Sequence, residues 1–286
     1  MVGKKDLLIS LGALGVSKLA RRVNSKLVGK VFESPEKLRG DRLLKGKVVR
    51  KAHQETGGRV VQDVSPEKIK EVLDFDVSGS PFFVAPNSIL GSGKIRERID
   101  KDLEKKLGKK KFRENKKLAD YLLSGNSVVF PSSKIDTDIL AHELGHGRHF
   151  RGESNSGLGK FLHKYPVTMT TKGVSALSKI NSIRSGISSG LGKEGKFGKG
   201  TAYGFPLLST ASVLGAEYAA SKEGLNILKE EGASKEQIDR YKRRMKSAFG
   251  TYLSHGISDI AENIALRHTS KALAANYKKY IGGGKN

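Results

Sequence analysis

The most informative motif of the chain is Ala141-His-Glu-Leu-Gly-His-Gly-Arg-His149. Within it, His142, Glu143 and His146 form the pattern His-Glu-x-x-His. Residues four apart lie on one face of an α-helix, so two imidazole nitrogens can bind one Zn²⁺ while Glu143 stands beside a bound water. The alternative is a pair of structural histidines on a helix. The spacing and the flanking apolar residues favour the metal site.

The third ligand of such a site determines its class. A catalytic zinc keeps three protein ligands and an open position for water. The chain has no Cys, so the third ligand is a His or a carboxylate. The metzincin extension is absent, because the chain has His149 and Gly152 where that pattern requires Gly and His. We expect the helix to end near Gly147, which makes His149 a poor ligand and favours a carboxylate from a second helix.

Glu217 is the candidate for this carboxylate. It lies inside a mostly apolar helical pattern over residues 211–228, where a carboxylate is costly unless it is paired or bound to a metal. Most other acidic residues lie in charged stretches typical of a solvated surface. Asp259 and Glu262, on a later helical pattern, remain the rivals of Glu217.

These motifs resemble a known family. His142 to His146, Glu217-Tyr-Ala-Ala-Ser221 and Ala248-Phe-Gly-Thr-Tyr252 are similar to motifs of the bacterial neutral zinc metallopeptidases, which are related to the M48-type gluzincin peptidases. The resemblance covers roughly residues 80–260. It implies a zincin-like core, zinc bound by His142, His146 and Glu217, and Glu143 as general base. Ser221 replaces the Asp of the wider gluzincin pattern.

The predicted fold class is α+β and mainly helical, with a zincin-like core and a small sheet beside the His-Glu-x-x-His helix. We expect residues 1–60 to form a basic amphipathic extension and residues 61–286 the metallopeptidase domain. Seven glycines within 186–204 predict a mobile, basic, Gly-rich loop at about 184–204.

Local patterns predict individual elements. Short strands are expected near 60–61, 81–85 and 127–130, and an extended substrate could pair with the edge of the third. Helices are expected at 66–75, 95–107, 116–123, 211–228 and 234–252, with a last one at 257–273. Residues 33–65 resemble a connector. Tyr252 and His255 are candidates for stabilising an oxyanion, although each is more often a packing or hydrogen-bonded residue.

The N-terminal pattern predicts a basic amphipathic helix. Apolar residues run from Leu7 to Val16 and continue as Leu19, Val23 and Leu27, with basic residues between them. We expect the apolar positions to pack on the body of the protein. A membrane surface or a nucleic acid is the alternative partner.

The chain is strongly basic, which fits either an anionic partner or a charge that only keeps the protein soluble. It carries 53 Lys and Arg against 29 Asp and Glu, a formal net charge of +24. Such a field attracts nucleic acid or an anionic membrane surface, or it only keeps the protein soluble. No nucleic-acid-binding module is recognisable, and no apolar run is long enough for a confident transmembrane helix.

The sequence therefore predicts a zinc-dependent metalloendopeptidase in which Glu143 takes a proton from a zinc-activated water. The alternative is a basic structural or packaging protein, associated with nucleic acid in a virion, with an inherited protease fold. A cytoplasmic, membrane-peripheral or virion location all fit the sequence. Its cofactor would be Zn²⁺ and its substrate a peptide or protein.

Overall fold

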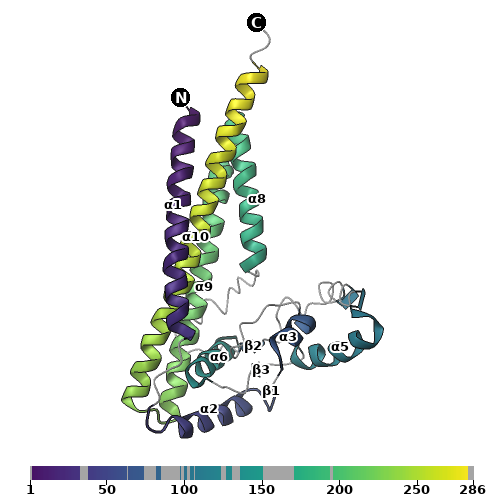
Figure 1. Ribbon diagram of the computed structural model, residues 1–286, viewed down its shortest axis with the longest axis vertical. Helices are drawn as coiled ribbons and strands as arrows, with labels where there is room; N and C mark the ends of the chain where they lie inside the picture. Colours follow the sequence, from purple (N-terminus) through teal and green to yellow (C-terminus); the bar gives the residue numbers. More distant parts are fainter. Residues whose placement is uncertain are drawn as a thin grey trace. The chain divides into compact units, whose positions relative to one another are not determined.

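The chain divides into two compact units, shown in the computed structural model of Figure 1. Unit 1 comprises Met1–Glu33, Met169–Leu214 and Arg244–Asn286, and unit 2 comprises Ser34–Thr168 and Gly215–Arg243. The structure describes residues 2–32, 38–62, 64–73, 82–84, 97, 100–101, 104–105, 107–123, 127–130, 136–150, 171–193 and 196–282. The units differ from the predicted division at residue 60, because the first 33 residues pack with two segments from the second half of the chain.

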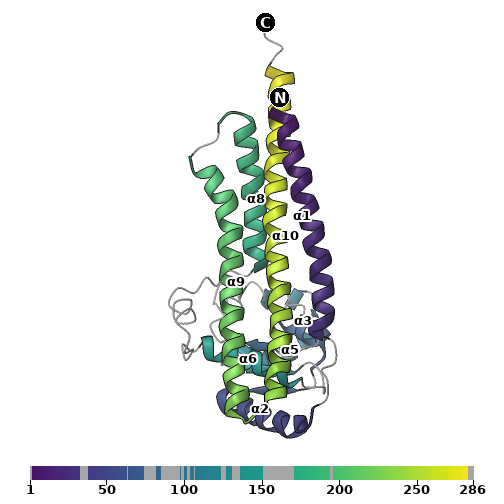
Figure 2. The same cartoon turned by 90° about the vertical axis from the view of Figure 1, so that its left-hand side faces the viewer.

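Unit 1 is a bundle of long helices. It contains α1 (Val2–Phe32), α8 (Thr171–Gly190), the first part of α9 (Lys196–Glu230) and most of α10 (Lys235–Gly282). Figures 1 and 2 show α1 and α8 running alongside α10. The two helices predicted for 234–273 are one continuous helix. Among the residues that the structure describes, no helix combines the length and the hydropathy needed to cross a bilayer.

The Gly-rich loop predicted at about 184–204 is wrong. Within the described residues, α8 continues to Gly190 and α9 begins at Lys196. The glycines of α8 serve close helix packing instead. A Cβ added to Gly186 would lie 2.3 Å from the carbonyl oxygen of Arg267, and one added to Gly190 would lie 2.4 Å from that of Lys271. The missing side chains thus let α8 approach the α10 backbone.

The helix α1 packs mainly through polar and small side chains, joined near its C-terminal end by Leu27 and Val31, while most of its large apolar residues are exposed. Its buried and half-buried residues are spaced alternately four and three positions apart. All the remaining residues from Lys4 to Lys30 are exposed. The buried and half-buried residues are Asp6, Ser10, Ala13, Ser17, Ala20, Asn24, Leu27 and Val31. The spacing is that of a coiled-coil seam. The predicted N-terminal helix and its packing against the protein are therefore confirmed, but most of its apolar stripe is exposed rather than buried.

The interior of unit 1 is held by hydrogen bonds between helices. The Ser17 hydroxyl lies 2.8 Å from that of Ser258. Hydroxyls of Ser178 and Ser182 on α8 donate to the Asn263 side-chain oxygen on α10, at 3.0 and 2.8 Å. These groups are buried, so each pair satisfies a polar atom that would otherwise be costly to desolvate.

Unit 2 contains the small sheet. It has three strands in the order β1 (Val60–Gln62), β3 (Ser127–Phe130) and β2 (Phe82–Val84). The β1 strand pairs parallel and β2 antiparallel to β3. The predicted strands are confirmed, but the expectation that β3 offers an edge to substrate is wrong, because both of its edges are already paired.

An aliphatic cluster lies between this sheet and two helices of unit 2. The helices are α3 (Pro66–Leu73) and α5 (Lys109–Leu123), and the predicted helices at 66–75 and 116–123 are confirmed. The fully buried members of the cluster are Ile69, Val72, Ala119, Leu122 and Val129. Only part of the predicted helix at 95–107 lies within the described residues, and that part is helical.

The helix α2 (Asp41–Glu55) was not predicted. Its segment was interpreted as a connector because charges and Gly46 interrupt the apolar pattern. Leu44, Val48 and Ala52, spaced by four, are buried and give the helix its single packing stripe.

Candidate metal centre

The helix α6 (Thr137–Phe150) carries the His-Glu-x-x-His residues. Its N-terminus is capped by Asp136, whose carboxylate accepts hydrogen bonds from the backbone N–H groups of Asp138 and Ile139, at 3.1 and 3.2 Å. The helix continues through Gly147 to Phe150, so the expected end near Gly147 is wrong.

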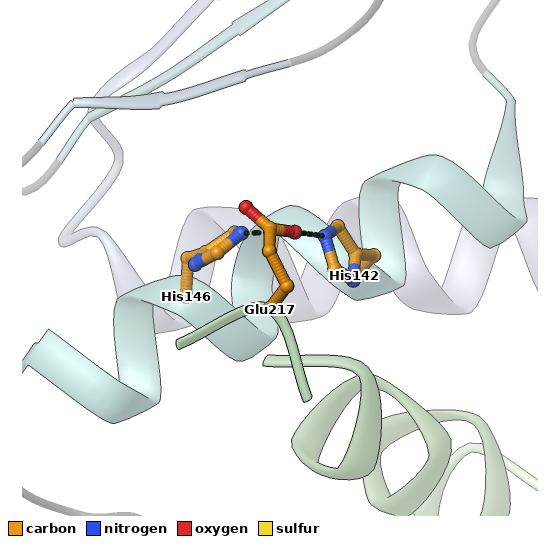
Figure 3. A group of neighbouring side chains, drawn as sticks. All are labelled: His142, His146 and Glu217. Carbon is orange, nitrogen blue, oxygen red and sulfur yellow. Dashed lines mark hydrogen bonds and ion pairs between the residues drawn. The ribbon is translucent and has the colours of Figure 1, made fainter. Parts of the chain in front are cut away.

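His142, His146 and Glu217 lie together in unit 2, as Figure 3 shows. The Glu217 Oε2 atom, from α9, lies 3.1 Å from the His142 Nε2 and 3.5 Å from the His146 Nε2. One donor atom from each residue lies within 4.8 Å of the others, and all three side chains are mostly buried. The structure therefore brings together two residues of one helix and a carboxylate 71 positions further along the chain than His146.

The rival carboxylates belong to unit 1, and Glu262 has other partners there. Glu262 forms ion pairs with Arg21 and with Lys179, the latter at 2.9 Å, and accepts a hydrogen bond from Ser17. Asp259 lies one turn earlier on α10. Among the described residues, the group that could hold a metal contains Glu217 and neither rival.

The buried Glu217 carboxylate is stabilised by positive charge on its neighbours. Burial raises the pKa of Glu217, but His146 and His142 more than offset it and hold that pKa well below its ordinary value. Burial lowers the pKa of His146, yet the charge and hydrogen bond of Glu217, together with the charge of Glu143, raise it to about 9. A proton on His146 thus balances the buried carboxylate when no other cation is present.

The donor set fits a zinc ion. Two imidazoles and one carboxylate match the ligands of catalytic zinc sites in both type and number. A divalent cation between them would balance the Glu217 carboxylate in place of the His146 proton. The fit rests on the convergence of these three side chains and on their burial, which reduces competition from water.

Ser221 contacts His142 and Tyr241 contacts Ser221, and neither was predicted to belong to the site. The Ser221 hydroxyl, one turn beyond Glu217, lies 3.2 Å from the His142 Nδ1. The Tyr241 hydroxyl donates to the Ser221 carbonyl at 2.9 Å. Contacts of this kind set the ring orientation and tautomer of a metal-binding histidine. Ser221 was visible in the motif, whereas Tyr241 was indistinguishable from an ordinary core residue.

Two glycines let α6 and α9 approach closely enough to form the cluster. A Cβ added to Gly145 would lie 2.0 Å from the Ala220 carbonyl oxygen. One added to Gly224 would lie 2.7 Å from the Ala141 carbonyl oxygen and 2.3 Å from the Tyr241 hydroxyl. No real Cβ is found so close to backbone atoms, so any larger residue would push the two helices apart.

Ion pairs fix both ends of α6. Near its C-terminus, Arg148 contacts Glu55 of α2 at 2.8 Å and Glu230 of α9 at 2.7 Å. Near its N-terminus, the buried Asp138 accepts a hydrogen bond from Arg240 of α10 at 3.1 Å. Because the arginines are mostly buried with paired carboxylates, these contacts restrict rotation of the helix that presents the two histidines.

The remaining predicted residues occupy different places. Glu143 is half-buried on α6, and its charge acts on His146. His149 is buried on the same helix and is not in the metal-binding group. Tyr252 and His255 belong to unit 1, where both are exposed, so neither is placed in the cluster.

Comparison of the chain with protein-family models, with curated proteins and with solved structures finds no significant match to any of them.

Proposed function

We propose that this protein is a zinc-dependent metalloendopeptidase of the gluzincin type. The observation that carries the proposal is the convergence of the His142, His146 and Glu217 donor atoms within 4.8 Å in a mostly buried site. The position of Glu143 on the same helix supports it, as does the resemblance of the motifs to neutral zinc metallopeptidases. The zincin-like core belongs to the same proposal.

The cofactor and the residues have separate tasks in this proposal. Zinc held by the three side chains would supply a Lewis acid for polarising a peptide carbonyl and activating water. Glu143 accepts the proton of the attacking water and delivers it to the nitrogen of the leaving amine. Glu217 balances charge, and Ser221 keeps the His142 ring oriented so that Nε2 faces the site.

Two variants distinguish the proposed metal ligand Glu217 from the proposed general base Glu143. Glu217→Ala removes a ligand and is expected to lose zinc and cleavage together. Glu143→Gln keeps the three ligands, so it is expected to retain one zinc per chain while cleavage falls by about 10² to 10⁴. The measurements are zinc content by mass spectrometry and cleavage of an unfolded protein substrate.

Glu231→Ala is the matched control for Glu217→Ala. Glu231 follows α9 directly, and its ion pair with Lys51 is long, at 4.0 Å. This variant should keep both zinc and cleavage. Retained turnover in Glu143→Gln contradicts the assignment of the base, and a wild type that binds no zinc contradicts the site. Zinc binding without cleavage would favour a structural role.

A further inference from the structure

Unit 1 exposes large apolar side chains where a water-soluble bundle would bury them. On α1, Leu8 is 70% exposed, Leu11 60% and Leu19 63%, whereas Asp6, Ser10 and Ser17 are buried. The other helices of the unit also carry exposed aliphatic residues. These are Ile180, Ile183 and Ile187 on α8, Leu207 and Leu208 on α9, and Leu253, Ile257 and Leu273 on α10. On α1, Leu7, Leu11 and Leu14 are spaced by four and three and are 49%, 60% and 43% exposed, so they form a strip along one face of the helix rather than isolated exposed residues.

The polar interior explains why these side chains face outward. The α1 seam is occupied by contacts with α10: Ser10 hydrogen-bonds with Thr269, Ser17 with Ser258, and Asp6 with His268 at 2.7 Å. Turning α1 to bury its leucines would bring its basic residues inward and break these hydrogen bonds. The outward direction of the leucines is therefore part of the packing of the unit.

The charges on α1 all have one sign at its exposed surface. Six basic side chains besides Arg21 are exposed along the helix. These are Lys4, Lys5, Lys18, Arg22, Lys26 and Lys30. Its one acidic residue, Asp6, is buried and paired with His268 and Lys271. The charge-free stretch from Leu7 to Ser17 thus has lysines on both sides.

The C-terminal part of α10 has the composition of a membrane interface. Tyr277 is 62% exposed and Tyr280 is 80% exposed, and Lys278 and Lys279 lie between them. The ion pair of Asp6 with Lys271, at 3.0 Å, places the N-terminal part of α1 beside this part of α10, as Figures 1 and 2 also show. Tyrosines and lysines of this kind concentrate at the level of lipid headgroups.

A second copy of the chain and a nucleic acid fit this surface less well. Pairing two α1 surfaces symmetrically would oppose six exposed basic residues with the same six, and charged residues are depleted in the cores of protein interfaces. A nucleic acid would neutralise the lysines but leave the leucines in water. An anionic lipid surface satisfies both groups, because headgroups meet the basic side chains and acyl chains meet the leucines.

We propose that unit 1 binds anionic membranes, with the leucines of α1 entering the lipid and the flanking lysines contacting the headgroups. This interaction is independent of the proposed peptidase activity. It lies on residues of unit 1, whereas the metal centre lies wholly in unit 2.

Vesicle flotation of the full-length protein tests the proposal. The wild type is expected to float with vesicles of phosphatidylserine and phosphatidylcholine and to float poorly with phosphatidylcholine alone. Leu8→Ser combined with Leu19→Ser should lower the apparent affinity for the anionic vesicles at least about tenfold, because two apolar side chains no longer enter the lipid. A second variant replaces four α1 lysines with Gln and should have an effect of at least that size. Its changes are Lys4→Gln, Lys5→Gln, Lys18→Gln and Lys26→Gln.

Matched variants in unit 2 provide the controls. Leu43 and Tyr121 are 65% and 43% exposed there, so Leu43→Ser with Tyr121→Ser changes comparable apolar surface. The charge control replaces four exposed lysines of unit 2. Its changes are Lys101→Gln, Lys105→Gln, Lys109→Gln and Lys110→Gln. Both controls should float like the wild type.

Three results would overturn the proposal. The first is absence of flotation with anionic vesicles. The second is unchanged flotation of the leucine variant, which would leave only non-specific charge attraction. The third is a wild-type dimer by light scattering that the leucine variant dissociates, which would assign the surface to a second copy. Circular dichroism and zinc content unchanged from the wild type show that each variant is folded.

Discussion

The interiors of the two units are built from different kinds of side chain. In unit 2, aliphatic residues such as Ile69, Leu122 and Val129 are fully buried, and the charged groups that are buried act at the ends of α6 or in the metal centre. In unit 1, serines, Asn263 and Arg267 form hydrogen bonds between the helices, while many leucines and isoleucines are exposed.

This difference indicates that apolar burial contributes more to the stability of unit 2, and hydrogen bonds between buried polar groups contribute more to that of unit 1. The hydrophobic effect near a buried aliphatic cluster scales with the apolar area removed from water. Unit 1 removes little aliphatic area at its α1 seam and instead pairs polar groups, whose net contribution is smaller but whose loss is costly. Unit 2 thus has an aliphatic core beneath its site, and the proposed membrane contact would cover the apolar side chains that unit 1 leaves exposed.

The largest effect should follow from a change at the close contact of α6 with α9. We expect Gly145→Ala to destabilise unit 2 by at least about 4 kcal/mol, above the usual range for overpacking, because the added Cβ meets backbone atoms that cannot rotate away. Separation of the helices would also move Glu217 away from the histidines. Urea unfolding and zinc content measure the two consequences.

The matched control for this change is Gly46→Ala. Gly46 lies inside α2 and has no heavy atom within 4 Å of a Cβ built on it. There, alanine should stabilise the protein by about 0.5 to 1 kcal/mol through its helix propensity. A Gly145→Ala protein that unfolds at wild-type urea concentrations and holds zinc would show that the close approach is not needed.

The next effect contrasts a buried leucine with an exposed one. Leu122 is fully buried in unit 2, so Leu122→Ala should lower the free energy of unfolding by about 2 to 5 kcal/mol. Leu8 is 70% exposed in unit 1, so Leu8→Ala should change it by less than about 0.5 kcal/mol. If the two substitutions lowered the free energy of unfolding equally, the assignment of Leu122 to a core and of Leu8 to the surface would be contradicted.

The two histidines could be predicted from the sequence because they lie on one helix. Of the features that depend on contacts between distant segments, only the carboxylate ligand could be predicted. The spacing of His142 and His146 defines a helix face by itself. Glu217 could be selected because a carboxylate in an apolar helix requires a partner. The close approach at Gly145 was not predictable, because a glycine within a helix gives no sign of which backbone it will meet. The metal itself stays a prediction.

The fold was predicted where elements are short and apolar, and not where polar residues make the contacts. The strands and α3 have local patterns that are independent of their partners. On α1, the apolar residues outnumber the seam residues, so the hydrophobic pattern indicated the wrong packing face. The residues spaced alternately four and three positions apart from Asp6 to Val31 are mostly polar or small. Such a row indicates a packing face only when it is known that another helix supplies hydrogen-bonding partners. For the same reason, glycines of α8 were interpreted as a loop.

An intermediate effect should follow from removing a polar contact in unit 1. Asn263 is 1% exposed and accepts hydrogen bonds from Ser178 and Ser182. Leu has the same branching as Asn but is bulkier, and Asn263→Leu leaves both buried hydroxyls without this acceptor, so we expect a loss of about 1 to 3 kcal/mol. Hydrogen exchange should show the loss in α8 and α10. If the leucine stabilised unit 1, its interior would follow ordinary hydrophobic packing and the contrast would fail.

The smallest effect concerns the Asp6 ion pair and depends on pH. Burial raises the pKa of Asp6, but hydrogen bonds and charges from His268 and Lys271 more than offset it and lower that pKa below its ordinary value. A carboxyl with a depressed folded-state pKa contributes stability above its unfolded pKa of about 3.9, and this stability is lost as pH falls through the folded value. Asp6→Asn should therefore cost about 1 kcal/mol at pH 7 and nothing once both states are protonated. Asp239→Asn is the control, because Asp239 is 45% exposed and its pair with Lys242 is loose, at 3.7 Å. A deficit of Asp6→Asn that does not shrink as the pH falls below about 3.9 would mean that Asp6 acts through packing rather than through its charge, because protonation would then not bring the two proteins together.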